Sequence, residues 1–440
     1  MMQKKLSYLW LILGLGSQLQ IVASLSITEC IVLFSAPFIF LKSYAQMKKD
    51  GVMPFFWMSI LVIVGCVIGC VANHSHPMAV LRGMATTCLI SCSIIYSHWI
   101  IRKDPSGFKW IMVGRAFSGI ISTFYFQKAV ELAQTGGDVD MIMSGPLFWI
   151  QRLGAFVILP TSGWYIHMPT AVNIVAPLFM AGFAILTSQS GRSTALGSIA
   201  FVAIVLIGGR KRRTMMRISR HFGLICCIGI ISIFAIHRAY KIAATQGWLG
   251  EDSRQKYERQ SQGEAGIGRL LLGGRAAAFV GLLACRDKPI IGWGPWAMDA
   301  KGYYEEFMAK YGTYEDFMEL QRAKQYNARK GIVQEHLIGC HSYITEFWLW
   351  YGMPGLIFWL YVMFVLLRYL KEDCYAVPQW FGWLACSIPG IFWAIFFSPF
   401  AGRFGTPLFV VACLMARAVR NGSFQLPFEM IEEIEKSERR

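Results

Sequence analysis

Charged residues are scarce in this sequence, since Asp, Glu, Lys and Arg make up only 15% of its 440 residues. Soluble proteins carry about a quarter, so a soluble domain of ordinary composition is excluded. Acidic residues are the scarcer sign, 26 against 42 lysines and arginines. The chain also shows no internal repeat, no low-complexity segment and no series of short alternating segments. These absences count against a repeat protein, a disordered linker and a transmembrane β-barrel.

Long apolar runs make up much of the sequence. Hydrophobic residues make up 55% of the chain, and its mean hydropathy is +0.45. The runs are about 16–25 residues long, the length at which a helix crosses a bilayer. We therefore predict an all-α polytopic membrane protein with about 12 transmembrane helices. The predicted spans are 6–22, 26–42, 54–72, 79–101, 109–131, 142–160, 170–188, 193–209, 222–239, 342–369, 379–398 and 404–419.

Basic residues orient this predicted bundle, because cytoplasmic loops of membrane proteins are rich in Lys and Arg. If Lys4 and Lys5 are cytoplasmic, the first apolar run is an uncleaved span. Every strong basic cluster then falls on the same side, namely 42–49, 102–109, "RKRR" at 210–213, 371–373 and the tail. Both termini are cytoplasmic in this topology. The formal net charge of +16 thus reflects membrane anchoring and not a nucleic-acid partner.

The predicted spans divide the chain into four parts. Residues 1–239 form an N-terminal bundle of about nine spans, 240–341 a loop on the outer face, 342–420 three further helices and 421–440 a cytoplasmic tail. We call residues 240–341 the cap. Its 12 acidic and 14 basic residues and its amphipathic runs are typical of a folded helical segment in water. The span 142–160 carries Gln151 and Arg152, and a re-entrant course is an open alternative for it.

Cysteines give no clear site. Most of the twelve lie within apolar runs, where Cys packs as a small hydrophobic residue. Cys285 and Cys340 lie in the cap instead. A disulfide between them is an open alternative if the cap faces an oxidising compartment.

Three residues predicted to lie on the outer face could carry chemistry. Arg192 is at the outer start of a span, Arg275 is in a helix-like run of the cap, and His341 is where the cap returns to the membrane. Guanidinium groups bind phosphate oxygens in a bidentate manner. Histidine is the side chain best suited to accept a proton near neutral pH. Two Arg and one His would therefore suit a diphosphate ligand and a proton transfer.

Three stretches around these residues resemble the O-antigen ligase and polymerase superfamily. "SQSGRSTALGSIAFVAIVLIGGRKRR" (188–213) resembles its Ser-Arg motif at the start of a span. "GGRAAAFVGLLACRDKPIIGWGPW" (273–296) resembles its Arg-bearing helix followed by Asp-x-Pro and Gly-x-Gly. "HSYITEFWLWYGMPGLIFWLY" (341–361) resembles its His-led return to the membrane. The carboxylate common near the last Gly of that motif is displaced here to Glu346.

The resemblance implies a metal-independent inverting glycosyltransferase of GT-C-like architecture in the bacterial inner membrane. Its donor would be a glycan on undecaprenyl diphosphate, and its acceptor a lipid A-core or another glycan or protein. Arg192 and Arg275, with Arg152 as a further candidate, would bind the diphosphate, and His341 would be the general base. Gly292, Trp293 and Gly294 could face the glycan, with a purely structural turn as the alternative. No cofactor is expected.

Several functions stay open at this point. An O-antigen ligase is favoured over an O-antigen polymerase because the chain has one dominant outer loop, and an O-linked protein oligosaccharyltransferase shares the same motifs. A polysaccharide transporter or lipid flippase would instead predict inverted repeats and charges near the membrane midplane. A non-catalytic scaffold for envelope assembly is the third class.

Overall fold

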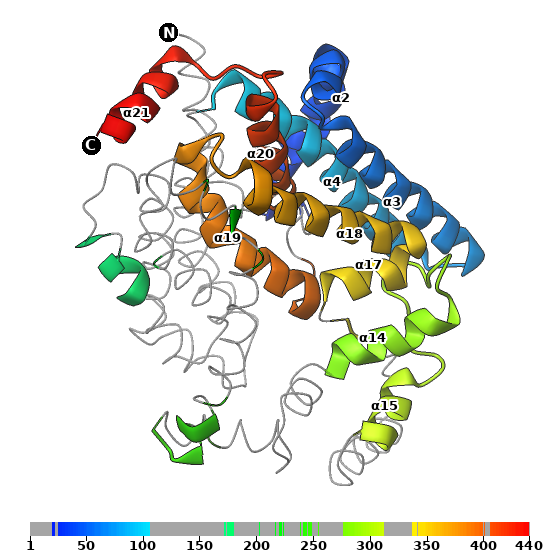
Figure 1. The fold of residues 1–440 in the computed structure, drawn as a ribbon. Coiled ribbons are helices and arrows are strands. Elements are labelled where there is room, and N and C mark those ends of the chain that lie inside the picture. Colours follow the sequence, from blue (N-terminus) through cyan, green and yellow to red (C-terminus); the bar gives the residue numbers. More distant parts are fainter. Residues whose placement is uncertain are drawn as a thin grey trace.

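The computed structural model describes residues 20–22, 25–105, 276–311, 337–340, 342–398, 400 and 405–439, with shorter pieces between 171 and 254. This part of the chain is mostly helical (Figure 1). Its helices are α2 (Ile27–Lys49), α3 (Met53–Ala72), α4 (Pro77–Lys103), α14 (Ala276–Asp287), α15 (Tyr303–Tyr311), α17 (Tyr343–Tyr351), α18 (Met353–Arg368), α19 (Pro378–Phe397), α20 (Gly405–Arg420) and α21 (Phe428–Arg439). The π-helix η2 (Tyr369–Asp373) extends α18, and the strands β1 (Gln20–Val22) and β2 (Leu25–Ser26) pair antiparallel.

Five of the described segments are long and apolar enough to cross a membrane, namely Glu29–Lys49, Met53–Ala72, Pro77–Lys103, Met353–Asp373 and Pro378–Phe397. They indicate a multi-pass membrane protein. Proline at the first or second position starts α3, α4, α18 and α19, because proline there loses no helical hydrogen bond. The predicted span 404–419 forms α20, whose 16 residues are too few for this group.

Two predicted spans differ from the structure. Of the predicted span 6–22, residues 6–19 lie outside the described residues, and 20–22 form a strand, a conformation that the β-branched Ile21 and Val22 favour. The predicted span 342–369 is interrupted at Gly352, which separates α17 from α18. Gly352 has φ 65°. The chain contacts the cap at this break, since Met353 N donates to Ile290 O at 2.9 Å.

The helices pack into one large apolar core that joins α2, α3 and α4 to α17–α20. Close approach is achieved with small residues, as is common between helices in a membrane. At Gly65 of α3, an added Cβ would lie 2.5 Å from Tyr351 O. A second, smaller core joins α14 and α15 to Ile338 and to Leu349 of α17. The cap is thereby continuous with the bundle through α17.

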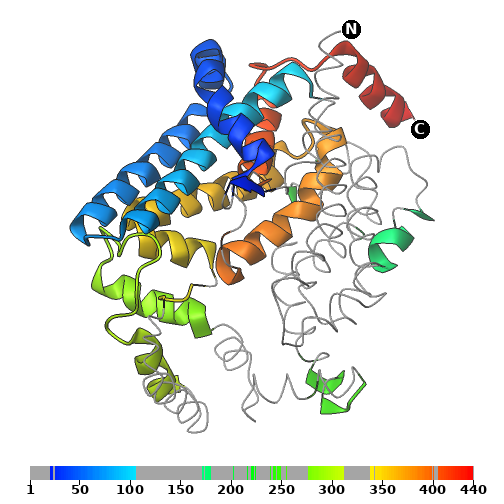
Figure 2. The same ribbon diagram turned by 180° about the vertical axis from the view of Figure 1, so that it is seen from behind.

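The described polar segments separate to the two ends of the bundle. At one end Arg102 contacts Asp50, Arg420 pairs with Asp373 at 3.0 Å, and the Trp380 indole donates to Pro105 O. We call this the basic end, and α21 lies beyond it (Figures 1 and 2).

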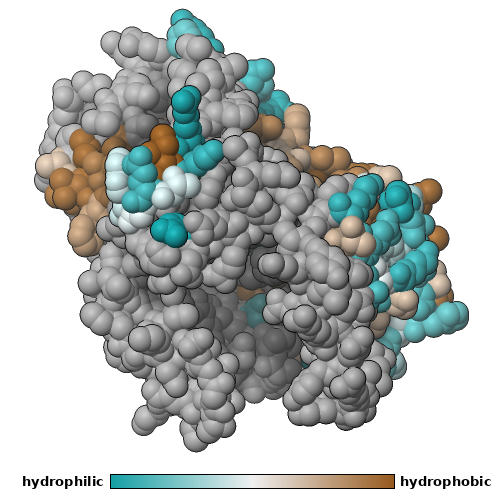
Figure 3. Space-filling model, turned by 90° about the horizontal axis from the view of Figure 1, so that it is seen from below, coloured by the Kyte–Doolittle hydropathy of each residue, from teal (hydrophilic) through white to brown (hydrophobic). Residues whose placement is uncertain are grey.

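At the other end, the α3–α4 turn, α14 and the start of α17 come together, and we call this the cap end. Seen from below (Figure 3), the described surface on the right, where α14 and α15 lie in Figure 1, is mainly hydrophilic, with hydrophobic surface beyond it. The segments that the charge pattern assigned to opposite sides of the membrane thus lie at opposite ends of these helices.

Candidate functional site

Four of the residues proposed from the sequence, Arg152, Arg192, Arg275 and His341, lie outside the described residues. The structure does describe the chain on either side of two of them. α14 begins at Ala276, directly after Arg275, and Cys340 and Ser342 flank His341. The described chain therefore shows how the segments next to Arg275 and His341 pack.

α14 packs against the segment that precedes His341. An added Cβ at Gly281 would lie 2.3 Å from the Cys340 Sγ, and one at Gly339 would lie 3.3 Å from the Cβ of Ala277. Glycine at 281 permits the closer approach, and at Gly339 a side chain would be tightly packed against α14. The contact joins the motif 273–296 to the residues directly before the motif 341–361, about sixty positions later in the sequence, and it is the central geometric feature of the cap end.

The loop after α14 pairs with the same segment. Ile338 N donates to Ala297 O at 2.9 Å, and Met298 and Leu337 form an isolated antiparallel bridge. Residues 337–340 are therefore held between α14 on one side and the loop 297–298 on the other.

Gly292, Trp293 and Gly294 form a tight turn against the membrane helices. Gly292 and Gly294 have φ of 77° and 81°, and an added Cβ at Gly292 would lie 2.6 Å from Gly352 N. Trp293 N donates to Leu349 O at 2.6 Å. The Trp293 indole donates to Ala284 O at 2.8 Å. These contacts favour the structural-turn alternative for this motif, while a glycan-facing role stays a prediction.

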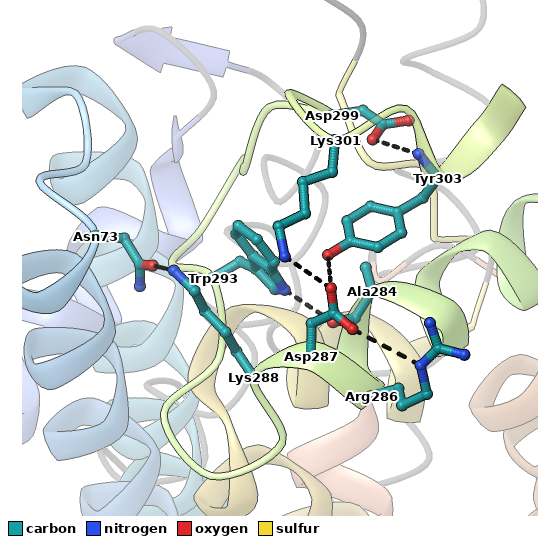
Figure 4. Close-up of polar contacts among 9 residues, drawn as sticks. All are labelled: Asn73, Ala284, Arg286, Asp287, Lys288, Trp293, Asp299, Lys301 and Tyr303. Carbon is teal, nitrogen blue, oxygen red and sulfur yellow. Dashed lines mark hydrogen bonds and ion pairs between the residues drawn. The ribbon is translucent and has the colours of Figure 1, made fainter. Parts of the chain in front are cut away.

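Asn73 and Lys288 fasten this turn to the end of α3. Asn73 Nδ2 donates to Gly292 O at 3.1 Å, and its Oδ1 accepts from Lys288 Nζ. Lys288 Nζ also lies 4.1 Å from the centroid of the Trp293 ring, a cation–π contact. Figure 4 shows Asn73 reaching Lys288 from α3. Neither Asn73 nor Lys288 was among the residues proposed from the sequence, because nothing local links them.

Asp287 is the centre of the polar contacts in Figure 4. Its Oδ2 accepts from Lys301 Nζ at 2.8 Å and from the Tyr303 hydroxyl at 2.7 Å, and Arg286 Nε lies 3.7 Å from Oδ1. The hydrogen bonds from Lys301 and Tyr303 lower the pKa of the Asp287 carboxyl below its ordinary value. Asp287 is the Asp of the Asp-x-Pro motif, and here it closes the loop 287–303.

A second carboxylate precedes α15. Asp299 accepts from Tyr303 N at 2.8 Å and from Tyr304 N at 3.0 Å, the first two N–H groups of α15, which have no partner within the helix. Burial raises the pKa of Tyr303, so its hydroxyl stays a donor to Asp287 at neutral pH. The charged groups of this loop thus organise the cap itself.

Ser342 and Glu346 fix α17 where it enters the bundle. The Ser342 hydroxyl accepts from Thr345 N at 3.2 Å, which makes Ser342 the N-cap, and donates to Ile395 O of α19 at 2.9 Å. Glu346 is 6% exposed and accepts from Phe400 N at 3.0 Å. This hydrogen bond ties the first turn of α17 to the chain after α19.

Cys285 and Cys340 are both free thiols. Burial raises the pKa of Cys285 to about 12 and that of Cys340 well above its ordinary value, so both are protonated at neutral pH. The disulfide considered from the sequence is not formed in this structure. Among the described residues, no three His, Cys, Asp or Glu side chains come together as metal ligands.

No family model, curated protein or solved structure matches this chain. The resemblance to the O-antigen ligase and polymerase superfamily therefore stands on the three sequence motifs alone. The structure adds that two of these motifs, 273–296 and 341–361, meet at the cap end.

Proposed function

We propose that this protein is a membrane glycosyltransferase with about 12 spans that acts on a glycan linked to undecaprenyl diphosphate at the outer face of the inner membrane. The observation that carries this proposal is the contact between α14 and residues 339–340. Arg275 directly precedes α14 and His341 directly follows Cys340.

The proposed reaction needs the two residue types that border this contact in the sequence, an Arg and a His. The acceptor hydroxyl oxygen attacks the anomeric carbon of the donor sugar and gives its proton to the His341 imidazole. A new glycosidic bond forms as the bond between that carbon and the diphosphate oxygen breaks. Arg275 and Arg192, with Arg152 as a further candidate, bind the diphosphate and stabilise the negative charge that it gains.

A ligase that joins O-antigen to lipid A-core is the reaction that we favour, because the cap is the one large outer loop that the sequence predicts. Exposed apolar side chains on α3 and α18, such as Trp57, Leu61 and Phe364, suit contact with lipid. The folded cap would bind the glycans in water. No step of this scheme requires a metal or cofactor.

Deleting the gene and separating the lipopolysaccharide of the strain on a gel tests the proposal. A ligase predicts loss of the O-chains together with accumulation of lipid-linked polymer. Core bearing a single repeat would instead identify a polymerase. An unchanged ladder would contradict both and leave transfer to protein as the reaction to assay.

A further inference from the structure

A cavity of about 280 Å³ opens at the basic end, remote from the cap. It is enclosed by the C-terminal end of α2 at Lys49, the turn 50–51 that follows, and the C-terminal parts of α18 and α20. Charged and apolar side chains line it together, among them Lys49, Arg417 and Phe364. The proposed transfer reaction makes no use of this cavity.

Most charges around the cavity are already paired. Asp50 Oδ2 contacts Arg102 and lies 2.8 Å from His98 Nε2. Arg368 pairs with Glu372 at 3.0 Å, and Arg420 pairs with Asp373 at 3.0 Å.

Two cations that line the cavity have no such partner. Neither Lys49 nor Arg417 has an ion pair or a side-chain hydrogen bond within the described part of the chain. Two cations without an ion pair of their own at the edge of one cavity favour an anionic ligand.

A buried carboxylate oxygen at the cavity indicates that the ligand also carries a hydrogen-bond donor. Asp50 also lines the cavity, its side chain is fully buried, and its Oδ1 has no donor among the described residues. A hydroxyl group on the ligand would supply this donor. A phosphate bearing a hydroxylated substituent meets both requirements.

The apolar surroundings show why such a ligand should be a lipid. Phe364 lines the cavity and is 54% exposed, and Leu360, one turn nearer the start of α18, is 46% exposed. On α3, Pro54 lines the cavity, and Trp57 and Leu61 continue as exposed apolar residues at helical spacing. An acyl chain lying on this surface would cover it, whereas a soluble anion would not.

We propose that this cavity binds the headgroup of an anionic phospholipid, with Lys49 and Arg417 on its phosphate and Asp50 on a headgroup hydroxyl. Phosphatidylglycerol has this chemistry. Basic pockets between helices on the cytoplasmic side are a known way to bind anionic headgroups. The charge pattern predicts that the basic end faces the cytoplasm, so the lipid belongs to the inner leaflet.

Native mass spectrometry of the full-length protein in detergent, titrated with phosphatidylglycerol or the zwitterionic phosphatidylcholine, tests this site. The wild type should bind phosphatidylglycerol more tightly than phosphatidylcholine. Each charge removed near the membrane surface should weaken phosphatidylglycerol binding about fivefold, so Lys49→Gln with Arg417→Gln should weaken it about 25-fold. Lys42→Gln with Arg82→Gln, which removes two exposed cations outside the cavity, should leave it unchanged.

Equal affinity of the wild type and the Lys49/Arg417 double variant would overturn the site. Displacement of the lipid by millimolar inorganic phosphate or glycerol phosphate would overturn its assignment to a lipid. If the double variant does not fold, Lys49→Gln alone serves, since Lys49 is exposed at the C-terminal end of α2. It should bind phosphatidylglycerol about fivefold more weakly, and Lys49→Arg should restore the affinity.

Discussion

Gly352 is the residue at which the membrane helix after the cap breaks, and it does so by contact with the cap. Its φ is 65°, and an added Cβ would lie 2.0 Å from Ile290 O. Gly51 has a similar φ of 75° but nothing within 4 Å of an added Cβ. Substitutions at these two glycines therefore distinguish the cost of backbone strain from the cost of a steric clash.

Gly352→Ala should destabilise the protein by about 3 kcal/mol or more, because strain and a clash with backbone act together. Gly51→Ala should cost only about 1 kcal/mol, from strain alone. Thermal unfolding of both variants in the same detergent measures the difference. Equal losses would contradict the contact between Gly352 and the cap.

The stability of the loop 287–303 should depend on pH through Asp287. Its folded-state pKa lies below its ordinary value of 3.8, with the Lys301 hydrogen bond as the largest cause and that of Tyr303 next. The carboxylate therefore stabilises the loop fully above the ordinary pKa, and this contribution is lost as the pH falls through the lower folded pKa. Near neutral pH the loop should be insensitive to pH.

Asp287→Asn should loosen the loop 287–303 at neutral pH and remove this acid dependence. Cleavage by trypsin after Lys301 at pH 7 and of the whole loop by pepsin at acidic pH would report both effects. The variant should be cleaved faster than wild type at pH 7, and the two should converge at the acidic end. A constant difference across the whole range would contradict the role given to the carboxylate.

At the scale of elements, Asn73 links the end of α3 to the cap. Replacing it with Ala removes its hydrogen bonds to Gly292 O and Lys288, at a cost of about 1 kcal/mol for each bond lost. The cap loop should then exchange its backbone amides faster with deuterium, and Trp293 should be the most affected. Asn421→Ala, at the basic end, is the matched control and should leave the cap unchanged.

The helices themselves were largely predictable, because each depends on its own apolar residues. The predicted spans 54–72 and 79–101 correspond to α3 (Met53–Ala72) and α4 (Pro77–Lys103). Charges mark where α2 ends at Lys48 and Lys49, seven residues beyond the predicted span.

The contacts between elements could not be predicted in the same way. The break at Gly352 depends on Ile290, and the burial of Glu346 depends on Phe400. Asp287 belongs to a quoted motif, but its partners Lys301 and Tyr303 follow a loop whose course no local pattern sets. The sequence thus predicts the elements and the motif but not the residues that they contact in the fold.

At the scale of the whole molecule, the two ends of the bundle should face opposite sides of the membrane. Ile290 is 69% exposed at the cap end, and Asn421 is exposed at the basic end. In intact spheroplasts, a membrane-impermeant maleimide should label the variant Ile290→Cys and label Asn421→Cys only after lysis. Labelling of Asn421→Cys without lysis would contradict the proposed orientation.

The central claim is that Arg275 and His341 act together where α14 meets residues 339–340. Its most direct test is glycan transfer by the purified protein in lipid nanodiscs, with an undecaprenyl diphosphate-linked donor and a lipid A-core acceptor. His341→Ala should lower the transfer rate by about 10²–10⁴-fold without changing the unfolding temperature. Arg275→Ala should weaken donor binding, while Arg82→Ala, an exposed Arg of α4, should change neither. Transfer at the wild-type rate by a folded His341→Ala protein would contradict the account.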